Sequence, residues 1–280
     1  MMNIISDIHK LQQICSELQK KNKIIGFVPT MGALHEGHLK LVRESKAKND
    51  VTVVSIFVNP TQFSPNEDLA KYPRPFEQDK KLLDNEKVDY LFHPNIKIIY
   101  PAGFQTYVIA KKLANIVEGK NRPGHFTGVA TVVLKLFNLV QPTNTYFGQK
   151  DFQQCVVIKQ MVKDLNLPIN INVVSTVRDK DGLALSSRNI FLNSQERLQA
   201  LSLYQSLLLG KKIILAGNKN VQTIKTRMNN YLQKYKLVLV DYIEICDPEN
   251  LSPVKVVSKK AVILITAYVG KTRLIDNIMI

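Results

Sequence analysis

The length, composition and charge of the chain exclude several classes of protein. With 280 residues, 45% of them hydrophobic and 22% charged, it resembles an ordinary globular protein of one large or two smaller domains rather than a disordered or fibrous one. The longest apolar run, residues 261–269, is too short to span a bilayer, and the N-terminus lacks the apolar centre of a signal peptide. Three widely spaced cysteines without metal-type spacing fit reduced thiols. We therefore expect a soluble, cytoplasmic protein.

The formal net charge of +15 favours anionic partners. The basic residues are scattered, however, and form neither an arginine-rich arm nor an aromatic RNA-binding signature. We therefore expect small anionic ligands such as nucleotides and carboxylates, and neither nucleic acid nor a membrane as partner.

Helix-like and strand-like segments alternate through about residue 175. Apolar residues at helical spacing predict helices over residues 6–20, 39–48, 76–86, 128–140 and 152–165. Short apolar runs predict strands over residues 24–28, 51–58, 88–92, 106–110, 145–148 and 169–174. This alternation predicts an α/β fold, a Rossmann-like doubly wound parallel sheet with right-handed crossovers. Ligands of such sheets bind beyond the carboxyl ends of the strands, so the residues that follow strands are the first candidates for a site.

The pattern of elements changes after residue 179. Asn193 and Glu196 have the spacing of a capping box before a predicted helix over residues 195–209, and a second helix is predicted near residues 221–234. Three strand-like runs follow, at residues 238–245, 261–268 and 272–280. We expect a catalytic domain of residues 1–180 and a smaller α+β C-terminal lid domain of residues 181–280.

Two of the five histidines, His35 and His38, follow the first buried strand and a glycine turn. A helix that begins near residue 36 would bring free backbone N–H groups and its positive dipole end to both imidazoles. The spacing puts both rings on one helix face, and Gly37 leaves room between them. Two such donors suit the charge that develops on a phosphoryl group under attack. A metal site with a third ligand and simple surface histidines are the alternatives at this point.

A second candidate motif is the serine loop at residues 184–189, ALSSRN. The His-x-Gly-His spacing resembles the nucleotidyltransferase superfamily, which includes class I aminoacyl-tRNA synthetases and carries a Lys-Met-Ser-Lys-Ser-like loop past the last core strand. The serine loop stands in that place. Its hydroxyls and the Arg188 guanidinium can hold polyphosphate oxygens.

Further stretches are similar to the pantoate–β-alanine ligase, or pantothenate synthetase, family. They are residues 58–63 (VNPTQF), 72–74 (YPR), 121–126 (NRPGHF), 146–154 (YFGQKDFQQ), 178–182 (RDKDG) and 273–277 (RLIDN). The resemblance runs from about residue 24 nearly to the end of the chain. It implies an ATP- and Mg²⁺-dependent condensation of pantoate with β-alanine through pantoyl adenylate, releasing pyrophosphate and then AMP, for pantothenate and coenzyme A biosynthesis. It also implies a homodimer formed through the N-terminal domain.

The resemblance also implies roles for individual residues. Those implied for ATP binding are Met31, Gly32, Ala33, Leu34, His35, Glu36, Gly37, His38, Gly148, Gln149, Lys150, Asp151, Val177, Leu185, Ser186, Ser187 and Arg188. The catalytic candidates among them are His38, His35, Lys150 and Arg188. Gln62 and Gln154 would bind pantoate through their amides, and Gln62 would also meet β-alanine. The sequence shows no dedicated group of carboxylates for Mg²⁺, so we expect the ion to rest mainly on the substrate phosphates and water.

Several positions keep an alternative interpretation. Asn59 and Tyr72 are weaker candidates for the pantoate site, and Tyr72 could simply pack. His125 could cap its helix or lie near the substrate. Asp151 could be a helix N-cap, and Lys150 a solvated surface lysine.

The chain departs from the family pattern at two positions, and two other functions remain as alternatives. Thr127 stands where a basic residue is common and Gln149 where an acidic one is common, and we expect both to tune activity rather than abolish it. One rival is an adenylyltransferase that stops at a dinucleotide product. The other is a degenerate tRNA-binding module, although about 100 residues after residue 193 leave little room for the domain that it would need.

Overall fold

The structure is a computed structural model that describes residues 2–64 and 69–280. The chain forms two compact units. The first comprises Met1–Gly148 with Gln153–Val174, and the second comprises Gln149–Phe152 with Ser175–Ile280. The change in pattern that the sequence shows after residue 179 thus lies close to the start of the second unit's main segment.

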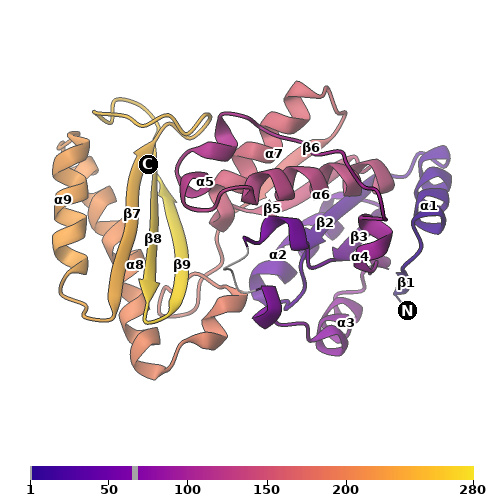
Figure 1. Ribbon diagram of the computed structural model, residues 1–280, viewed down its shortest axis with the longest axis horizontal. Helices are drawn as coiled ribbons and strands as arrows, with labels where there is room; N and C mark the ends of the chain where they lie inside the picture. The colour runs from indigo at the N-terminus through magenta and orange to yellow at the C-terminus, as the bar shows by residue number, and fades with distance from the viewer. Residues whose placement is uncertain (1, 65–68) are drawn as a thin grey trace. The chain divides into compact units, whose positions relative to one another are not determined.

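The first unit is built on a six-stranded sheet in the order β1-β4-β3-β2-β5-β6, in which every neighbouring pair is parallel (Figure 1). Its strands are β1 (Asn3–Ile5), β2 (Ile25–Thr30), β3 (Val51–Ile56), β4 (Tyr90–Phe92), β5 (Asn144–Gly148) and β6 (Asn170–Val174). The predicted doubly wound parallel sheet is therefore confirmed. The central strands β2 and β3 are buried because helices cover both faces, which explains their almost continuous apolar sequence.

Long and short helices connect these strands. They are α1 (Ile8–Lys20), α2 (Glu36–Lys48), α3 (Phe76–Asn85), α6 (His125–Val140) and α7 (Phe152–Asp164), with the short α4 (Ile96–Ile99), α5 (Glu118–Asn121), η1 (Pro60–Gln62), η2 (Leu69–Lys71) and η3 (Leu113–Asn115). Right-handed crossovers in this strand order put α1, α6 and α7 on one face of the sheet and α2 and α3 on the other. In agreement, α1 packs against α6, while α2 packs against β2, β3 and β5.

One predicted strand is wrong and one strand was not predicted. Residues 106–110 run without a strand partner, and the Val108 N–H donates instead to the Thr131 hydroxyl of α6 at 2.9 Å. The β-branched and aromatic residues of this segment suited a strand, but no strand of the sheet pairs with it in the structure. β1, only three residues long, was too short to give a recognisable pattern. The helix start expected near residue 36 is confirmed, because α2 begins at Glu36, whereas α6 begins at His125, three residues before its predicted start.

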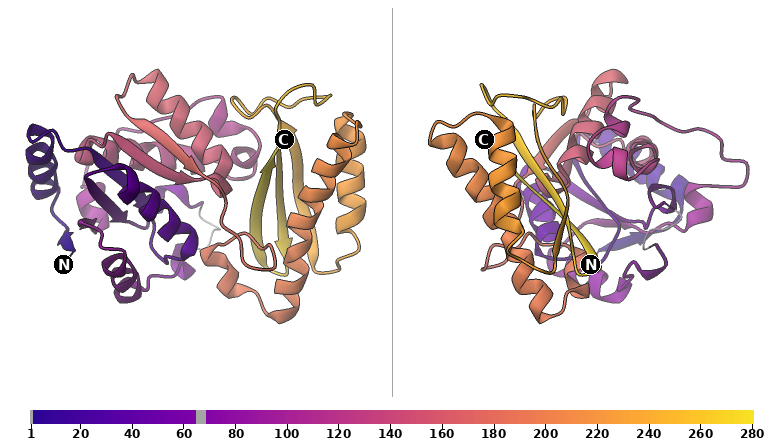
Figure 2. Two further views of the ribbon diagram at one scale, coloured as in Figure 1. Left: turned by 180° about the vertical axis from the view of Figure 1, so that it is seen from behind. Right: turned by 60° about the vertical axis from the view of Figure 1, so that its left-hand side comes forward.

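The second unit has an antiparallel sheet of order β7-β8-β9 with helices packed on it, so the predicted α+β class is confirmed (Figure 2, right). Its elements are η4 (Gln149–Asp151), η5 (Ser187–Phe191), α8 (Ser194–Leu215), α9 (Val221–Leu232), β7 (Val238–Cys246), β8 (Val262–Val269) and β9 (Thr272–Met279). The predicted capping box starts α8. The Asn193 N–H donates to Glu196 Oε2 and the Glu196 N–H to Asn193 Oδ1, both at 2.9 Å.

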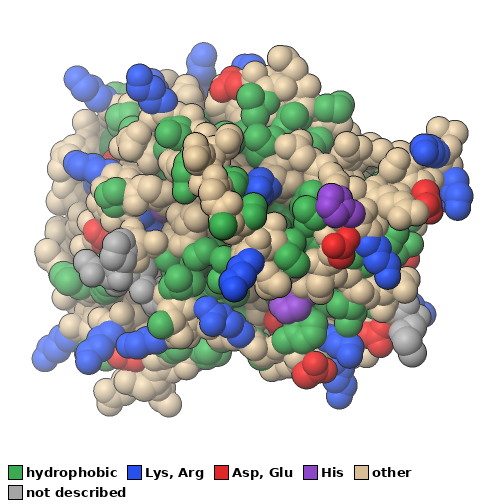
Figure 3. All heavy atoms as spheres, turned by 45° about the vertical axis from the view of Figure 1, so that its right-hand side comes forward, with side chains coloured by type: hydrophobic (Ala, Val, Ile, Leu, Met, Phe, Trp, Pro, Cys, Tyr) green, Lys and Arg blue, Asp and Glu red, His purple; other side chains and the backbone are tan. Residues whose placement is uncertain are grey.

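Two properties of the whole described chain bear on function. Lys and Arg side chains are spread among hydrophobic and acidic ones over the face drawn in Figure 3, as the sequence indicated. Within residues 2–64 and 69–280, no helix combines the length and apolar character needed to cross a bilayer.

Candidate active site

The loop after β2 is shaped by a buried carboxylate from another helix. Gly32 and Ala33 both have positive φ, and the Ala33 and Leu34 N–H groups donate to the two oxygens of Asp79 at 2.8 and 2.7 Å. A Cβ on Gly32 would lie 2.9 Å from Asp79 Oδ2, so glycine is required by both the backbone angle and the carboxylate. Burial raises the pKa of Asp79, while the two backbone N–H groups oppose that rise. Asp79 therefore positions the loop that leads to the histidines.

The two histidines begin α2 as a reciprocal cap. His35 is the N-cap, and its Nδ1 accepts from the Gly37 N–H at 3.1 Å. In the second bond of the cap, His38 Nδ1 accepts from the His35 N–H at 3.3 Å. The ring centroids are 4.1 Å apart. Since each Nδ1 accepts, the neutral tautomer of each ring carries its proton on Nε2, and both rings can donate from that atom beside a helix N-terminus.

A metal centre is the alternative interpretation of the histidine pair. In the part of the chain that the structure describes, no group of three or more His, Cys, Asp and Glu side chains is arranged to hold a metal ion. The caps also use both Nδ1 atoms. The geometry thus favours a pair of hydrogen-bond donors for an anion.

Gln62 lies next to the histidine loop. It ends the short η1 turn after β3, its exposed fraction is only 8%, and its Nε2 donates to Met31 Sδ at 3.1 Å. The structure therefore brings together Met31, predicted for ATP, and Gln62, predicted for pantoate. Both follow neighbouring parallel strands, as ligand-binding residues of such sheets do.

The backbone of Gln62 is fixed by α6. His125 is buried and its Nδ1 lies 2.8 Å from the Gln62 carbonyl oxygen, which can only accept, so Nδ1 is the donor. The alternative of a helix cap is wrong, because Gly124 is the N-cap of α6 and no side chain caps it. A Cβ on Gly128 would lie 2.3 Å from the Thr61 carbonyl oxygen. This glycine lets α6 touch the Gln62 turn, and a glycine inside the apolar stripe was the sequence signal for it.

The adjacent glutamines of α7 have different surroundings. Gln153 is buried and its Nε2 donates to the Leu113 and Ile116 carbonyls, both at 2.8 Å. Gln154 is partly exposed, and its side chain makes no hydrogen bond to any described residue. The amide of Gln154 is thus available to a ligand, whereas that of Gln153 fastens a loop. Gly148 ends β5, and three residues separate it from the first residue of α7.

Tyr72 packs as the alternative interpretation suggested. It is buried, and its ring meets Phe63 edge-on with centroids 5.9 Å apart.

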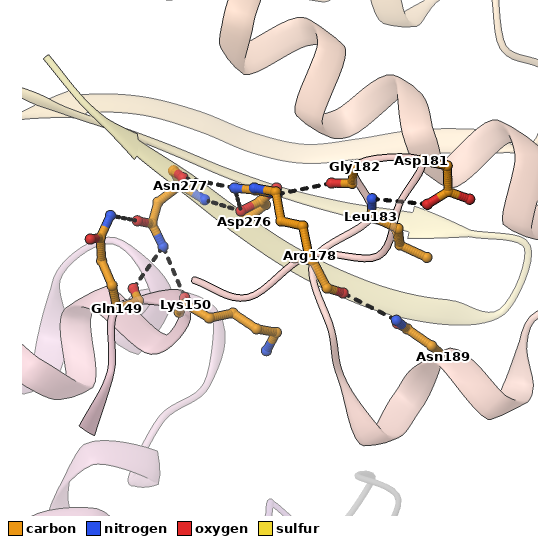
Figure 4. A network of polar contacts seen from close by, with 10 residues as sticks. Gln149, Lys150, Arg178, Asp181, Gly182, Leu183, Asn189, Asp276 and Asn277 are labelled. Carbon is orange, nitrogen blue, oxygen red and sulfur yellow. Dashed lines mark hydrogen bonds and ion pairs between the residues drawn. The ribbon is translucent and has the colours of Figure 1, made fainter. Parts of the chain in front are cut away.

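In the second unit, the turn that carries Lys150 is clamped by β9. Asn277 Nδ2 donates to the carbonyls of Gln149 and Lys150, both at 2.9 Å, and Gln149 Nε2 donates to Asn277 Oδ1 at 3.2 Å (Figure 4). Gln149, which stands where we expected an acidic residue to be common, thus contributes its amide to this clamp. Asp151 belongs to the same turn, and its Oδ1 lies 3.6 Å from the Lys150 ammonium.

The serine loop follows a hairpin that is attached to β9 of the same unit. Arg178 and Asp276 form a two-pronged ion pair with N–O distances of 2.6 and 2.9 Å (Figure 4). The Leu185 N–H donates to the Val177 carbonyl at 3.0 Å and closes the hairpin. Ser186 then caps the short η5 turn, its Oγ accepting from the Arg188 N–H at 3.3 Å. These hydrogen bonds fix the positions of the Leu185 and Arg188 N–H groups, with Ser187 between them.

A comparison with known families decides the identity. The sequence model described as pantoate-beta-alanine ligase matches residues 3–279. The chain belongs to the pantoate–β-alanine ligase family. It is accordingly an enzyme of the ligase class, with the fold of that family.

Individual members of the family support this assignment over the full length. The pantothenate synthetase of Thermotoga neapolitana is 52% identical over 276 residues, 99% of each chain, and that of Caldicellulosiruptor saccharolyticus is 53% identical over 279 residues, 100% of this chain and 99% of the relative. The crystal structure of the Thermus thermophilus pantothenate synthetase has a TM-score of 0.94 at 42% identity and covers 99% of each chain. The Francisella tularensis enzyme, solved with β,γ ATP and β-alanine, has a TM-score of 0.81 at 41% identity and covers 100% of this chain and 98% of its own.

The residues expected to bind ATP fall into both units. Met31 to His38 and Gly148 belong to the first unit, and residues 149–151, 177 and 185–188 belong to the second. The anchors that hold them, Asp79, Asp276 and Asn277, were not assigned roles from the sequence. Their signals were weak, because a single buried polar residue inside a helix or strand has no characteristic spacing.

Proposed function

We propose that the protein condenses pantoate with β-alanine in two steps at the expense of ATP. In the first, a pantoate carboxylate oxygen attacks the α-phosphorus; the new O–P bond forms pantoyl adenylate and the bond to pyrophosphate breaks. In the second, the neutral amine of β-alanine attacks the acyl carbon, a C–N bond forms, AMP leaves with the carboxylate-derived oxygen, and the amine loses a proton. Adenylation is needed because a carboxylate is a poor acylating agent at neutral pH.

The observation that carries this proposal is that two kinds of donor, from the loop after β2 and from η1 after β3, lie next to each other. His35 and His38 offer Nε2–H groups at the N-terminus of α2, which suits phosphate oxygens. Gln62 offers an amide N–H next to Met31 of the same loop, which suits a carboxylate or hydroxyl oxygen. ATP and an organic acid would then be side by side, as attack on the α-phosphorus requires. The relative solved with β,γ ATP and β-alanine supports these ligand classes.

The remaining roles complete the proposed mechanism. His38 donates to the oxygen that bridges to pyrophosphate, with His35 beside it. Lys150 and Arg188 neutralise charge on the α, β and γ phosphates, and Gln154 holds pantoate with Gln62. A Mg²⁺ ion bound to the ATP phosphates would offset charge on the triphosphate and on the departing pyrophosphate.

The setting of the reaction is part of the same proposal. The region after residue 180 acts as a lid that excludes water from the adenylate, since the serine loop lies at its start. The protein works in the cytoplasm as a homodimer, without nucleic-acid partners, and supplies pantothenate for coenzyme A biosynthesis.

An isotope experiment tests the two-step reaction. Pantoate labelled with ¹⁸O in its carboxylate is incubated with ATP, Mg²⁺, β-alanine and the protein, and the nucleotide product is analysed by mass spectrometry. We expect AMP that carries one ¹⁸O atom, released only when β-alanine is present. Label in inorganic phosphate together with ADP would refute adenylation. A pantoate-independent dinucleotide product would instead support the simple adenylyltransferase.

A further inference from the structure

The amide of Gln62 is one end of a polar network that continues through Asn59 to two hydroxyl groups. Asn59 Oδ1 accepts from the Tyr100 hydroxyl at 2.8 Å and from the Thr61 hydroxyl at 3.0 Å. Asn59 Nδ2 donates to the Gly128 carbonyl at 3.1 Å and to Gln62 Oε1 at 3.0 Å. Asn59 is 1% exposed, and these four bonds use its whole hydrogen-bonding capacity. Asn59 therefore acts on a ligand through Gln62 rather than by direct contact.

The network determines which way the oxygen and the nitrogen of the Asn59 and Gln62 amides point. The Gly128 carbonyl can only accept, so the Asn59 nitrogen must face it. Both hydroxyls then meet the Asn59 oxygen, which is the arrangement in which they can donate. The second proton of Asn59 Nδ2 requires an oxygen on Gln62. The Gln62 nitrogen consequently faces Met31 Sδ, a weak acceptor that a substrate oxygen would outcompete.

Tyr100 is suited to remain a donor in this arrangement. Burial raises the pKa of its hydroxyl, with the Thr61 hydroxyl opposing the rise. The Thr61 hydroxyl lies 3.1 Å away and is itself a donor to the same Asn59 oxygen. Two protonated hydroxyls thus converge on one buried oxygen.

We propose that Tyr100 and Thr61 are positioning residues that act through Asn59 to present the Gln62 amide N–H groups to the substrate. In this orientation the Gln62 nitrogen can bind a substrate atom that accepts hydrogen bonds, such as a carboxylate or hydroxyl oxygen. It disfavours a substrate amide N–H at the same place. The inference rests on the proposed function, in which Gln62 binds pantoate. Without the two hydroxyls, the buried Asn59 oxygen loses its donors. Only the bond to the Gly128 carbonyl then orients the Asn59 amide, and through it the Gln62 amide.

The test removes each hydroxyl with little change in shape. Tyr100→Phe and Thr61→Val lose the donor, alone and together, whereas Thr61→Ser keeps it. Tyr107→Phe is the matched control, because Tyr107 is 52% exposed and packs on Phe104 outside the network. Each lost hydroxyl should raise the KM for pantoate about two- to tenfold, the range expected for one hydrogen bond, and the double variant should raise it further. The KM for ATP should not change, and Thr61→Ser and Tyr107→Phe should match the parent protein.

The possible results distinguish failure of the positioning role from failure of the proposed function. Equal loss of kcat in Thr61→Val and Thr61→Ser, or an unchanged KM for pantoate in the double variant, would overturn the positioning role and indicate packing alone. A parent protein that releases no pantoate-dependent AMP would reject the proposed function itself, before any variant is compared.

Discussion

The role of His38 can be tested with a substitution that keeps its structural contact. His38 has two polar ring atoms with different proposed tasks, since its Nδ1 caps the His35 N–H and its Nε2–H is the proposed donor to the phosphates. His38→Asn keeps an acceptor oxygen near the position of Nδ1 but has nothing in place of Nε2–H. His38→Ala removes both. The pair of variants therefore separates the cap from the chemistry.

The expected magnitudes differ for the two functions. Loss of one donor matched to transition-state charge costs roughly 2.7–4 kcal/mol, so both variants should slow pantoyl adenylate formation by about 10²- to 10³-fold. Loss of a helix cap costs about 1 kcal/mol, so only His38→Ala should lower the free energy of unfolding by that amount. The attack of β-alanine on pre-formed pantoyl adenylate needs no donor at a departing pyrophosphate and should change much less in both.

Single-turnover assays decide the question. Rapid quenching with ATP and pantoate measures the first step, and β-alanine added to synthetic pantoyl adenylate measures the second. Denaturant titration checks that each variant is folded. Equal losses in the two steps, or a first step of normal rate in His38→Asn, would show that the reasoning about His38 is wrong.

Three further predictions concern Gln62, Asp79 and the second unit. Gln62→Ala should weaken pantoate binding more than ATP binding in isothermal titration calorimetry, and an unchanged pantoate affinity would refute its assignment. Burial raises the pKa of Asp79 in the folded protein above its unfolded value, so its contribution to stability is fully present below about pH 4 and is lost as the pH rises through the folded pKa. The stability of the parent protein relative to Asp79→Asn should therefore fall with rising pH above about pH 4 in denaturant titrations; a rise would contradict this sign. Small-angle scattering should show a smaller radius of gyration with ATP and pantoate than without, whereas unchanged dimensions would argue against a lid.

The fold class and most elements could be predicted because their causes are local. Continuous apolar runs identified the buried strands β2 and β3, and helical periodicity identified the main helices. The capping box of α8 was visible as Asn193 and Glu196, three residues apart. Residues 106–110 show the limit of this reasoning, since the Val108 N–H donates to the side chain of Thr131, which lies 23 residues away in the sequence.

The sequence by itself determined which chemical groups the site has, and only the tertiary structure decided how they are oriented. The histidine spacing indicated a helix start, because capping depends on neighbouring residues. The carboxylate that bends the preceding loop lies 45 and 46 residues away, on α3. The direction of the Gln62 amide depends on Tyr100, through Asn59, and on Gly128, which lies 69 residues from Asn59. Hydrogen bonds between such distant residues form only when the sheet aligns their strands and helices, so no local pattern can encode them.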